Sequence, residues 1–299
     1  MSLTESLDPQ NLRVAVRAGN LIGESPVWSV REQALYWVDV EGRLVQRFVP
    51  GTGALHRWTM PEVTSCIGLR RGGGLVAATR TGFVFLDTGT GSVAPIVHPE
   101  SDIPGNRFND GKVDRRGRFW AGTKNIANTT DPTGSVYRLD ADRTAHRIDD
   151  GISCTNGIAW SPDDRVMYLC DTWIRRIYRY AFDPDAGVAS RRAVFVELTS
   201  DAGYPDGLTV DAEGYIWSAH YNGWRISRYA PDGRLDRVVR IPVQHVTSLI
   251  FGGADLRTLF VTSASARLSP EARAGQPEAG HIFAFEPGVT GLPEPEFLG

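Results

Sequence analysis

Oxygen-bearing side chains stand at the beginning of several short strand-like segments of this chain. Glu24 opens Glu-Ser-Pro-Val-Trp, Asn156 opens Asn-Gly-Ile-Ala-Trp, and Asp206 opens Asp-Gly-Leu-Thr-Val after an expected tight turn at Pro205. Carboxylate and amide oxygens are the ligands that Ca²⁺, Mg²⁺ and Mn²⁺ prefer, and Zn²⁺ is a further candidate. If the fold brings these three side chains together, they form a candidate site for one divalent metal ion.

The same strand-turn-strand block recurs about every 40–50 residues, which is the spacing of β-propeller blades. Each copy has three short segments rich in β-branched and aromatic residues, and a fourth strand fits the segments between copies, such as Leu55-His-Arg-Trp. Six copies predict an all-β fold, a six-bladed β-propeller with four-stranded antiparallel blades, as a single domain over residues 1–299. A two-sheet sandwich would also contain many short strands, but it does not explain a four-stranded unit that recurs six times.

In a propeller the innermost strand of each blade lines the central channel, so residues at the heads of these strands meet near the axis. The six heads are Glu24, Cys66 or Ile67, Asn109 or Asp110, Asn156, Asp206 and Ser248. Buried carboxylates repel one another unless something neutralises them, and a divalent cation does so. The competing interpretation is that Asn-Gly and Asp-Gly are ordinary turn dipeptides. Three oxygen donors at matching repeat positions favour a central metal site.

The composition argues against several classes of protein. Hydrophobic residues make up 41% of the chain, enough for a sizeable core, and a formal net charge of −3 argues against a nucleic-acid partner. Cys66, Cys154 and Cys170 lack the spacing of a zinc site or a disulfide framework. No signal-peptide pattern and no apolar run of membrane-spanning length is visible, so we expect a cytoplasmic protein without a membrane partner. Nothing in these patterns indicates an oligomeric state.

A set of motifs spread over nearly the whole chain is specific to one family. These are Gly-Glu-Ser-Pro-Val-Trp at 23–28, Asn-Arg-Phe-Asn-Asp-Gly-Lys-Val-Asp at 106–114, Thr-Asn-Gly-Ile-Ala-Trp-Ser-Pro-Asp at 155–163 and Pro-Asp-Gly-Leu-Thr-Val-Asp at 205–211. With them the chain resembles the SMP-30/gluconolactonase/regucalcin family. The resemblance implies a six-bladed propeller that binds one divalent metal ion and hydrolyses a sugar (aldono-) lactone to the aldonic acid.

Carried over position by position, the resemblance implies a role for five residues. Glu24, Asn156 and Asp206 become the metal ligands, and Asp206 also becomes the catalytic acid/base. Arg107 and Asn109 become the pair that hydrogen-bonds the substrate. In such a site the metal polarises the lactone carbonyl, while Asp206 accepts a proton from water and returns it to the leaving alkoxide.

One stretch departs from the family pattern. Animal members carry an acidic, substrate-contacting residue where this chain has Ala127, within the segment that begins at Lys124. The family's substrate preference is therefore not carried over. Trp173, Tyr221 and Trp224 lie outside the repeating core aromatics, and we consider both a sugar-binding mouth and ordinary packing for them.

Two alternatives to lactone hydrolysis stay open. The same metal site could serve another ester hydrolase or a phosphotriester hydrolase, because a P=O group is polarised in the same way as a carbonyl. From a different class, the chain could be a non-catalytic, calcium-binding regulatory propeller, which would need a partner surface and would have no use for Arg107 in substrate binding.

Overall fold

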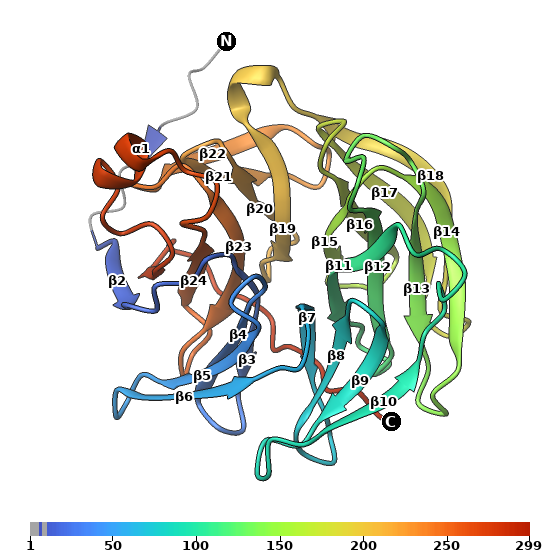
Figure 1. Ribbon diagram of the computed structural model, residues 1–299. Coiled ribbons are helices and arrows are strands. Elements are labelled where there is room, and N and C mark those ends of the chain that lie inside the picture. The colour runs from blue at the N-terminus through green and yellow to red at the C-terminus, as the bar shows by residue number, and fades with distance from the viewer. Residues whose placement is uncertain (1–5, 8–10) are drawn as a thin grey trace.

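The computed structural model describes residues 6–7 and 11–299, which form six β-sheets arranged around a central axis (Figure 1). Five sheets have four strands, and the sixth has a fifth strand, β1 (Ser6–Leu7), which pairs in parallel with β22. Within each blade the four main strands pair antiparallel with their neighbours in the sheet. The predicted six-bladed propeller with four-stranded antiparallel blades is confirmed.

The strands fall into four sets by their distance from the axis. The innermost strands are β3 (Gly23–Ser29), β7 (Thr64–Leu69), β11 (Asn106–Val113), β15 (Thr155–Trp160), β19 (Tyr204–Val210) and β23 (Val246–Gly252). The second strands are β4 (Ala34–Asp39), β8 (Leu75–Thr79), β12 (Phe119–Asn125), β16 (Val166–Asp171), β20 (Ile216–Tyr221) and β24 (Thr258–Ser263). The third strands are β5 (Leu44–Val49), β9 (Gly82–Leu86), β13 (Gly134–Leu139), β17 (Arg176–Asp183), β21 (Arg225–Tyr229) and β25 (Ile282–Phe285). The outermost strands are β6 (Ala54–Thr59), β10 (Val93–Val97), β14 (Ala145–Ile152), β18 (Val188–Glu197), β22 (Leu235–Arg240) and β2 (Arg13–Val16).

The last blade is built from both ends of the chain. Its three inner strands, β23 to β25, come late in the sequence, and its outer strand β2 comes from the beginning, with Arg13 opposite Ala284 and Val14 opposite Phe283. The sequence showed only three strands for this copy. Because the fourth strand is separated from its partner by nearly the whole chain, no local pattern predicts the pairing.

The C-terminal tail after β25 runs across one end of the central channel. Gly291 forms a bridge with Asp211, Phe297 forms one with Arg70, and between them Glu294 pairs with Lys112 at 3.6 Å. Phe297 is fully buried. The tail therefore links three blades across the end of the channel that lies farthest from the strand heads.

Large aromatic residues fill the space between blades. Trp120, Trp217 and Tyr168 occupy equivalent positions on second strands, each opposite an arginine of the third strand. In the first blade Tyr36 has this position, and Trp37 lies one residue further along the strand. Trp37, Trp120 and Trp217 are completely buried, and Tyr168 is nearly so. Burying an aromatic side chain of this size supplies a large part of a blade's hydrophobic stabilisation. All four side chains belong to the hydrophobic core.

Every innermost strand has a β-bulge near its head. The register with the second strand shifts there in all six blades. The residues left outside the regular pairing are Ser25 and Pro26, Ser65, Asn109, Gly157, Asp206 and Gly207, and Thr247. A bulge bends the strand and changes the direction of its side chains, so each blade can aim a head residue at the axis.

The expected tight turn at Pro205-Asp206-Gly207 is wrong. These residues lie inside β19, and the two-residue bulge between Pro205 and Leu208 produces the local irregularity. Glycine is needed at position 207 because of packing and not because of a turn. A Cβ atom there would collide with the Ser248 side chain of the neighbouring inner strand. Gly157 is likewise pressed against the backbone of Asp206. The glycines that follow Asn156 and Asp206 therefore reflect close packing at the axis and not turn formation.

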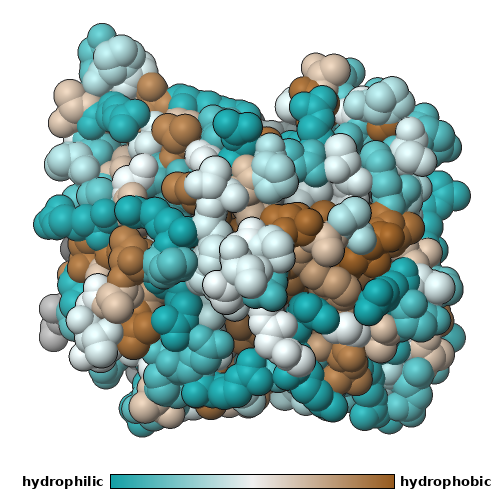
Figure 2. Space-filling view, turned by 60° about the horizontal axis from the view of Figure 1, so that its bottom comes forward, coloured by the Kyte–Doolittle hydropathy of each residue, from teal (hydrophilic) through white to brown (hydrophobic). Residues whose placement is uncertain are grey.

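The outer surface is mostly polar. Hydrophilic side chains cover much of the face shown in Figure 2, with apolar residues in smaller groups between them. The exposed large hydrophobic residues are distributed over several blades and loops, and include Val30, Leu55, Ile174, Val194 and Trp224. In the described part of the chain, no helix is both long and apolar enough to cross a bilayer.

Candidate active site

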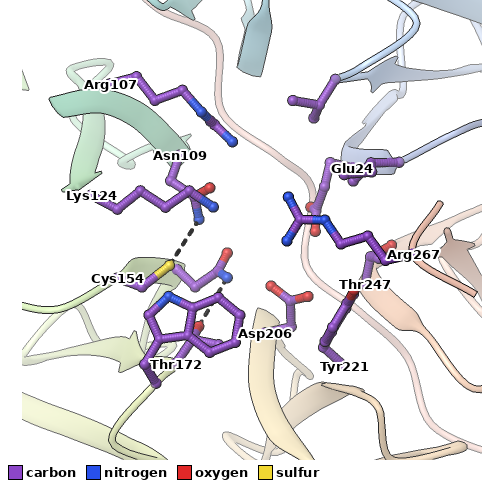
Figure 3. Close-up of a pocket in the computed structure, with 14 residues that line it drawn as sticks. Glu24, Arg107, Asn109, Lys124, Cys154, Thr172, Asp206, Tyr221, Thr247 and Arg267 are labelled. Carbon is purple, nitrogen blue, oxygen red and sulfur yellow. Dashed lines mark hydrogen bonds between the residues drawn. The ribbon is translucent and has the colours of Figure 1, made fainter. Parts of the chain in front are cut away.

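A cavity lies on the propeller axis at the heads of the inner strands. It encloses about 560 Å³ of space, including the part that is open to solvent. All five residues singled out in the sequence line it, namely Glu24, Arg107, Asn109, Asn156 and Asp206. Figure 3 shows the labelled side chains approaching this space from different blades. The fold thus brings together residues that are up to 182 positions apart (206 − 24 = 182).

The carboxylates of Glu24 and Asp206 are buried and poorly hydrogen-bonded. Asp206 is 5% exposed, and its Oδ1 atom has no hydrogen-bond partner among the described residues. Glu24 is 7% exposed, and its Oε2 accepts a hydrogen bond from the Ser25 backbone N–H at 2.9 Å. Burial raises the pKa of both carboxyl groups well above the usual values, and repulsion by Asp110 raises them further. The hydrogen bonds of these two carboxylates do not compensate their burial.

Asp110 adds a third carboxylate just beyond the site. It lines a smaller cavity farther along the axis and is 6% exposed. Burial raises its pKa to about 6, although its Oδ1 accepts a hydrogen bond from the Gly111 N–H at 2.7 Å. The sequence left Asn109 and Asp110 open as the head of the third blade. The structure points Asn109 into the main cavity and Asp110 away from it.

The amide of Asn156 is oriented by Thr172. Thr172 Oγ1 donates its single proton to the carbonyl oxygen of Pro205 at 2.9 Å, so it must accept the hydrogen bond that joins it to Asn156. Asn156 Nδ2 is therefore the donor, at 3.0 Å, and its Oδ1 is left for another partner. In this orientation Asn156 presents an oxygen ligand and not an amide hydrogen.

Arg107 and Asn109 are held in place along the cavity wall formed by β11. Arg107 Nη1 donates to Ser65 Oγ at 3.0 Å and to the carbonyl oxygen of Phe108 at 2.7 Å. Asn109 Nδ2 donates to the carbonyl oxygen of Thr155 at 2.9 Å. Arg107 is half-buried and lines the cavity, so it is not an ordinary surface arginine.

Two of the heads expected at the axis do not reach the cavity. Cys66 and Ile67 are buried in hydrophobic clusters of the second blade. In the sixth blade the bulged Thr247 lines the cavity, whereas Ser248 packs beside Gly207 and lines the smaller cavity. A one-residue shift on a strand moves a side chain to the other face, and the bulge introduces such a shift here.

Several cavity residues were missed or left open by sequence reasoning. Lys124 and Arg267 line the cavity without having been singled out for it, and so does Thr172. The only signal for Lys124 in the sequence is that it begins the segment that departs from the family pattern. Burial lowers the pKa of Lys124, and the neighbouring Arg107 lowers it further.

Of the three aromatic residues considered for the mouth, two line the cavity. Trp173 packs edge-to-face on Tyr204, with ring centroids 5.3 Å apart, and Tyr221 stacks on His245 at 4.2 Å. Trp224 is 39% exposed and is not part of the cavity wall. The two aromatic faces suit the apolar faces of a small ring compound.

The donor set fits a hard divalent cation. In residues 6–7 and 11–299, no group of three or more His, Cys, Asp and Glu side chains is arranged to hold a metal ion. The set at the axis is instead two carboxylates, Glu24 and Asp206, and the amide oxygen of Asn156. The unpartnered, buried Asp206 Oδ1 is the atom that a cation would satisfy. All-oxygen ligands favour Ca²⁺, Mg²⁺ or Mn²⁺ over Zn²⁺.

Comparison with known proteins gives a consistent result. Residues 22–265 match the family model described as the SMP-30/gluconolactonase/LRE-like region. The chain is 37% identical over 291 residues to a 6-deoxy-6-sulfogluconolactonase of Pseudomonas putida, covering 97% of this chain and 99% of that protein. It is 36% identical over 277 residues to regucalcin of Homo sapiens, covering 90% and 91%. A solved structure of regucalcin from Agrobacterium tumefaciens, described as a calcium-binding protein, has a TM-score of 0.92 at 29% identity and covers 98% of this chain and 99% of that one.

Proposed function

The chain belongs to the SMP-30/gluconolactonase/LRE-like family, and on that premise we propose that it is a lactonase that hydrolyses a sugar lactone to the aldonic acid. Support comes from a relative that is named as a sugar lactonase and is similar over almost its entire length. The observation that carries the proposal is the pair of buried carboxylates, Glu24 and Asp206, in an open cavity, with one oxygen of Asp206 left without a partner.

We propose Glu24, Asn156 and Asp206 as the residues that hold one divalent cation. When bound, this ion would supply a Lewis acid for the lactone carbonyl. Ca²⁺ is the first candidate because the donors are all oxygens and a structural relative is described as calcium-binding. Mg²⁺, Mn²⁺ and Zn²⁺ are the ions to compare with it.

Asp206 is the proposed acid/base. A water molecule attacks the lactone carbonyl carbon while Asp206 accepts one of its protons, and the bond between that carbon and the ring oxygen then breaks. Asp206 returns the proton to the ring oxygen, which becomes a hydroxyl group, and the new carboxylic acid releases its own proton to solvent. Asp206 suits this role because the Glu24 carboxylate already accepts a hydrogen bond from Ser25, whereas Asp206 Oδ1 accepts none.

Arg107 and Asn109 are proposed to bind the sugar hydroxyl groups. Their contacts with Ser65, Phe108 and Thr155 hold the two side chains along one wall before substrate arrives. Fixing the ring relative to Asp206 reduces the entropy that must be lost when the transition state forms. Their contribution is orientation, whereas Asp206 moves the proton.

The test is proton release during lactone opening, measured on protein stripped of metal and then supplied with Ca²⁺, Mg²⁺, Mn²⁺ or Zn²⁺ separately. We expect turnover of at least one aldonolactone that depends on the added ion and is lost with a chelator. Tight ion binding without turnover of any lactone would contradict the proposal. In that case phosphotriesters and other esters would be assayed next, and failure with these as well would favour a non-catalytic, calcium-binding propeller.

A further inference from the structure

The cavity wall contains more positive charge than a neutral sugar requires. Three cationic side chains line it, Arg107, Lys124 and Arg267, against the two carboxylates of Glu24 and Asp206. These formal charges sum to +1, and a divalent cation at the axis would raise the sum to +3. Concentrating like charge in a half-buried cavity costs free energy. An uncharged lactone would do nothing to offset it.

Two of these charges lie directly opposite each other on neighbouring strands. Arg107 on β11 is the register partner of Lys124 on β12. Like charges at directly opposed positions of an antiparallel pair destabilise the sheet. In Figure 3 both side chains extend from the same wall into the cavity, and the guanidinium of Arg267 reaches in from the opposite side.

The protein provides little counter-charge for this group. Among the described residues, Lys124 Nζ makes no hydrogen bond and has no carboxylate oxygen within 4.0 Å. Arg107 has only neutral partners, Ser65 Oγ and the Phe108 carbonyl oxygen. Arg267 pairs with Glu41 at 3.5 Å, but both side chains are largely exposed, so this pair is weak.

An alternative role for Lys124 is to neutralise the axial carboxylates. Its positive charge does favour the ionised forms of Glu24 and Asp206. However, it forms no ion pair with either residue, and a divalent cation bound between them would take over this role. The two explanations predict different behaviour when Lys124 is replaced.

We propose that the substrate carries an anionic substituent, such as a sulfonate, phosphate or carboxylate, and that Lys124 binds it while Arg267 faces it from the other side. Only Nη1 of Arg107 is used in hydrogen bonds with the part of the protein that the structure describes, so this guanidinium can contact the substituent as well as a sugar hydroxyl group. The inference rests on the proposed lactonase function and specifies its substrate class. The ammonium group of Lys124 and the guanidinium of Arg107 can together donate several charge-assisted hydrogen bonds to one oxyanion.

The experiment compares a neutral lactone with anionic lactones that differ from it in one substituent. They are D-glucono-1,5-lactone, its 6-deoxy-6-sulfonate and its 6-phosphate, each assayed as kcat/KM with the ion that supports turnover. We expect the wild type to prefer at least one anionic lactone by about 10-fold or more. The sulfonate and phosphate arms show which oxyanion the site accepts, and a carboxylate-bearing aldarolactone provides a third arm.

Lys124→Met is the diagnostic variant, because it removes the charge and keeps a long side chain. We expect the preference for the anionic lactone to fall about 10-fold, mainly through KM, as expected for losing one hydrogen bond to a charged group. Lys124→Arg should keep most of the preference. Arg257→Met removes one exposed positive charge at the far end of the β23–β24 hairpin and serves as the control for net charge.

The outcomes separate this inference from the proposed function. Wild type that opens the neutral lactone at least as well as all anionic ones would overturn the inference and leave the function intact. Equal slowing of both substrates in Lys124→Met, together with weaker ion binding, would also overturn it and assign Lys124 to the axial carboxylates. If no lactone is opened at all, the proposed function fails. Calorimetric binding of the sulfonated aldonate, compared with the neutral aldonate, then still tests the anion site.

Discussion

The protein contains two kinds of buried carboxylate, and they differ in their hydrogen bonds and not in their burial. Asp211, just after the inner strand β19, is completely buried. Its oxygens accept hydrogen bonds from two backbone N–H groups, from Trp217 Nε1 at 2.8 Å and from Arg228 at 2.7 and 2.9 Å. Asp114 occupies the equivalent position in the third blade with the same types of donor. At the other end of β19, Asp206 is nearly as buried, yet one of its oxygens has no partner.

We infer from this difference that Asp211 and Asp114 serve the fold, and it supports the chemical role proposed for Asp206. A buried charge with a full set of donors stabilises its surroundings and is poorly placed to accept anything else. A buried charge without donors is costly, and a folded protein tolerates it where a ligand or a reaction supplies what is missing. Asp211 and Asp206 belong to the same strand region, so substitutions at these two positions test the distinction.

The largest effect is expected from Asp206→Asn. The variant loses the proposed proton acceptor and one ligand charge, so kcat/KM for lactone opening should fall about 10³-fold or more. In chelator its melting temperature should stay the same or rise, because a buried charge that repels Glu24 and Asp110 is removed. Thermal unfolding and initial rates measure both quantities. Wild-type turnover in this variant would contradict the assignment of Asp206.

Asp211→Ala should show the opposite pattern. The substitution leaves the guanidinium of Arg228, whose side chain is 5% exposed, without its most buried partner. The free energy of unfolding should fall by about 3 kcal/mol, while the folded protein keeps a kcat/KM close to that of the wild type. Denaturant titration gives the stability. Unchanged stability combined with lost turnover would show that the two kinds of carboxylate had been assigned the wrong way round.

Thr172→Val tests how far the axial donors depend on their surroundings. Without the Thr172 hydroxyl, Asn156 Nδ2 loses its acceptor, and the amide can rotate and present a hydrogen to the cation. We expect ion affinity to fall about 10- to 100-fold, measured by calorimetric titration of the ion into stripped protein. Thr172→Ser keeps the hydroxyl and is the control. Equal affinity in Thr172→Val would mean that Asn156 is not a ligand or does not need this contact.

The smallest effect concerns pH and Asp110. Its pKa is raised from 3.8 to about 6 in the folded protein. The protonated Asp110 side chain therefore makes its full contribution to stability below pH 3.8, and this contribution is lost as the pH rises through 6. In ion-free protein, Asp110→Asn should gain on the order of 1 kcal/mol relative to wild type between pH 5 and pH 7.

Other groups also change protonation in this pH range, so the stability of the variant must be compared with that of the wild type at each pH. Burial lowers the pKa of His220 to about 3, which destabilises the fold as pH falls, but this contribution is common to both proteins. The measurement is urea unfolding at both pH values in chelator. A constant difference between the two proteins would show that Asp110 is not held in its protonated form by the site.

The architecture, and the convergence of Glu24, Asn156 and Asp206 on one cavity, could be predicted from the sequence for a physical reason. Strand signals and oxygen-bearing heads repeat locally, and a closed ring of blades must bring equivalent positions together. Glu24, Asn156 and Asp206 could therefore be selected without coordinates. Their glycine neighbours were ambiguous, because Asn-Gly and Asp-Gly are also turn dipeptides, and only the close approach of the inner strands resolves that ambiguity.

The remaining parts of the site depend on register and on loop paths. Lys124 reaches the cavity because β12 pairs with β11 in the register that opposes it to Arg107. Arg267 comes from an irregular segment after β24 and has a left-handed backbone, with φ of 64°. Thr247 lines the cavity in place of the expected Ser248 because a one-residue bulge shifts the strand. None of these features has a local sequence pattern that identifies it, so single-sequence reasoning could not place them.

The blade shared by β2 and β25 has a consequence for the order of events during synthesis. Blades one to five can assemble as they leave the ribosome, but the ring cannot close until Ile282–Phe285 emerges and pairs with Arg13–Val16. Until then Glu24 in the first blade and Asp206 in the fifth blade lie at the two ends of an incomplete ring. The proposed cation site, which needs Glu24 and Asp206 in one cavity, is therefore expected to be complete only in the finished molecule.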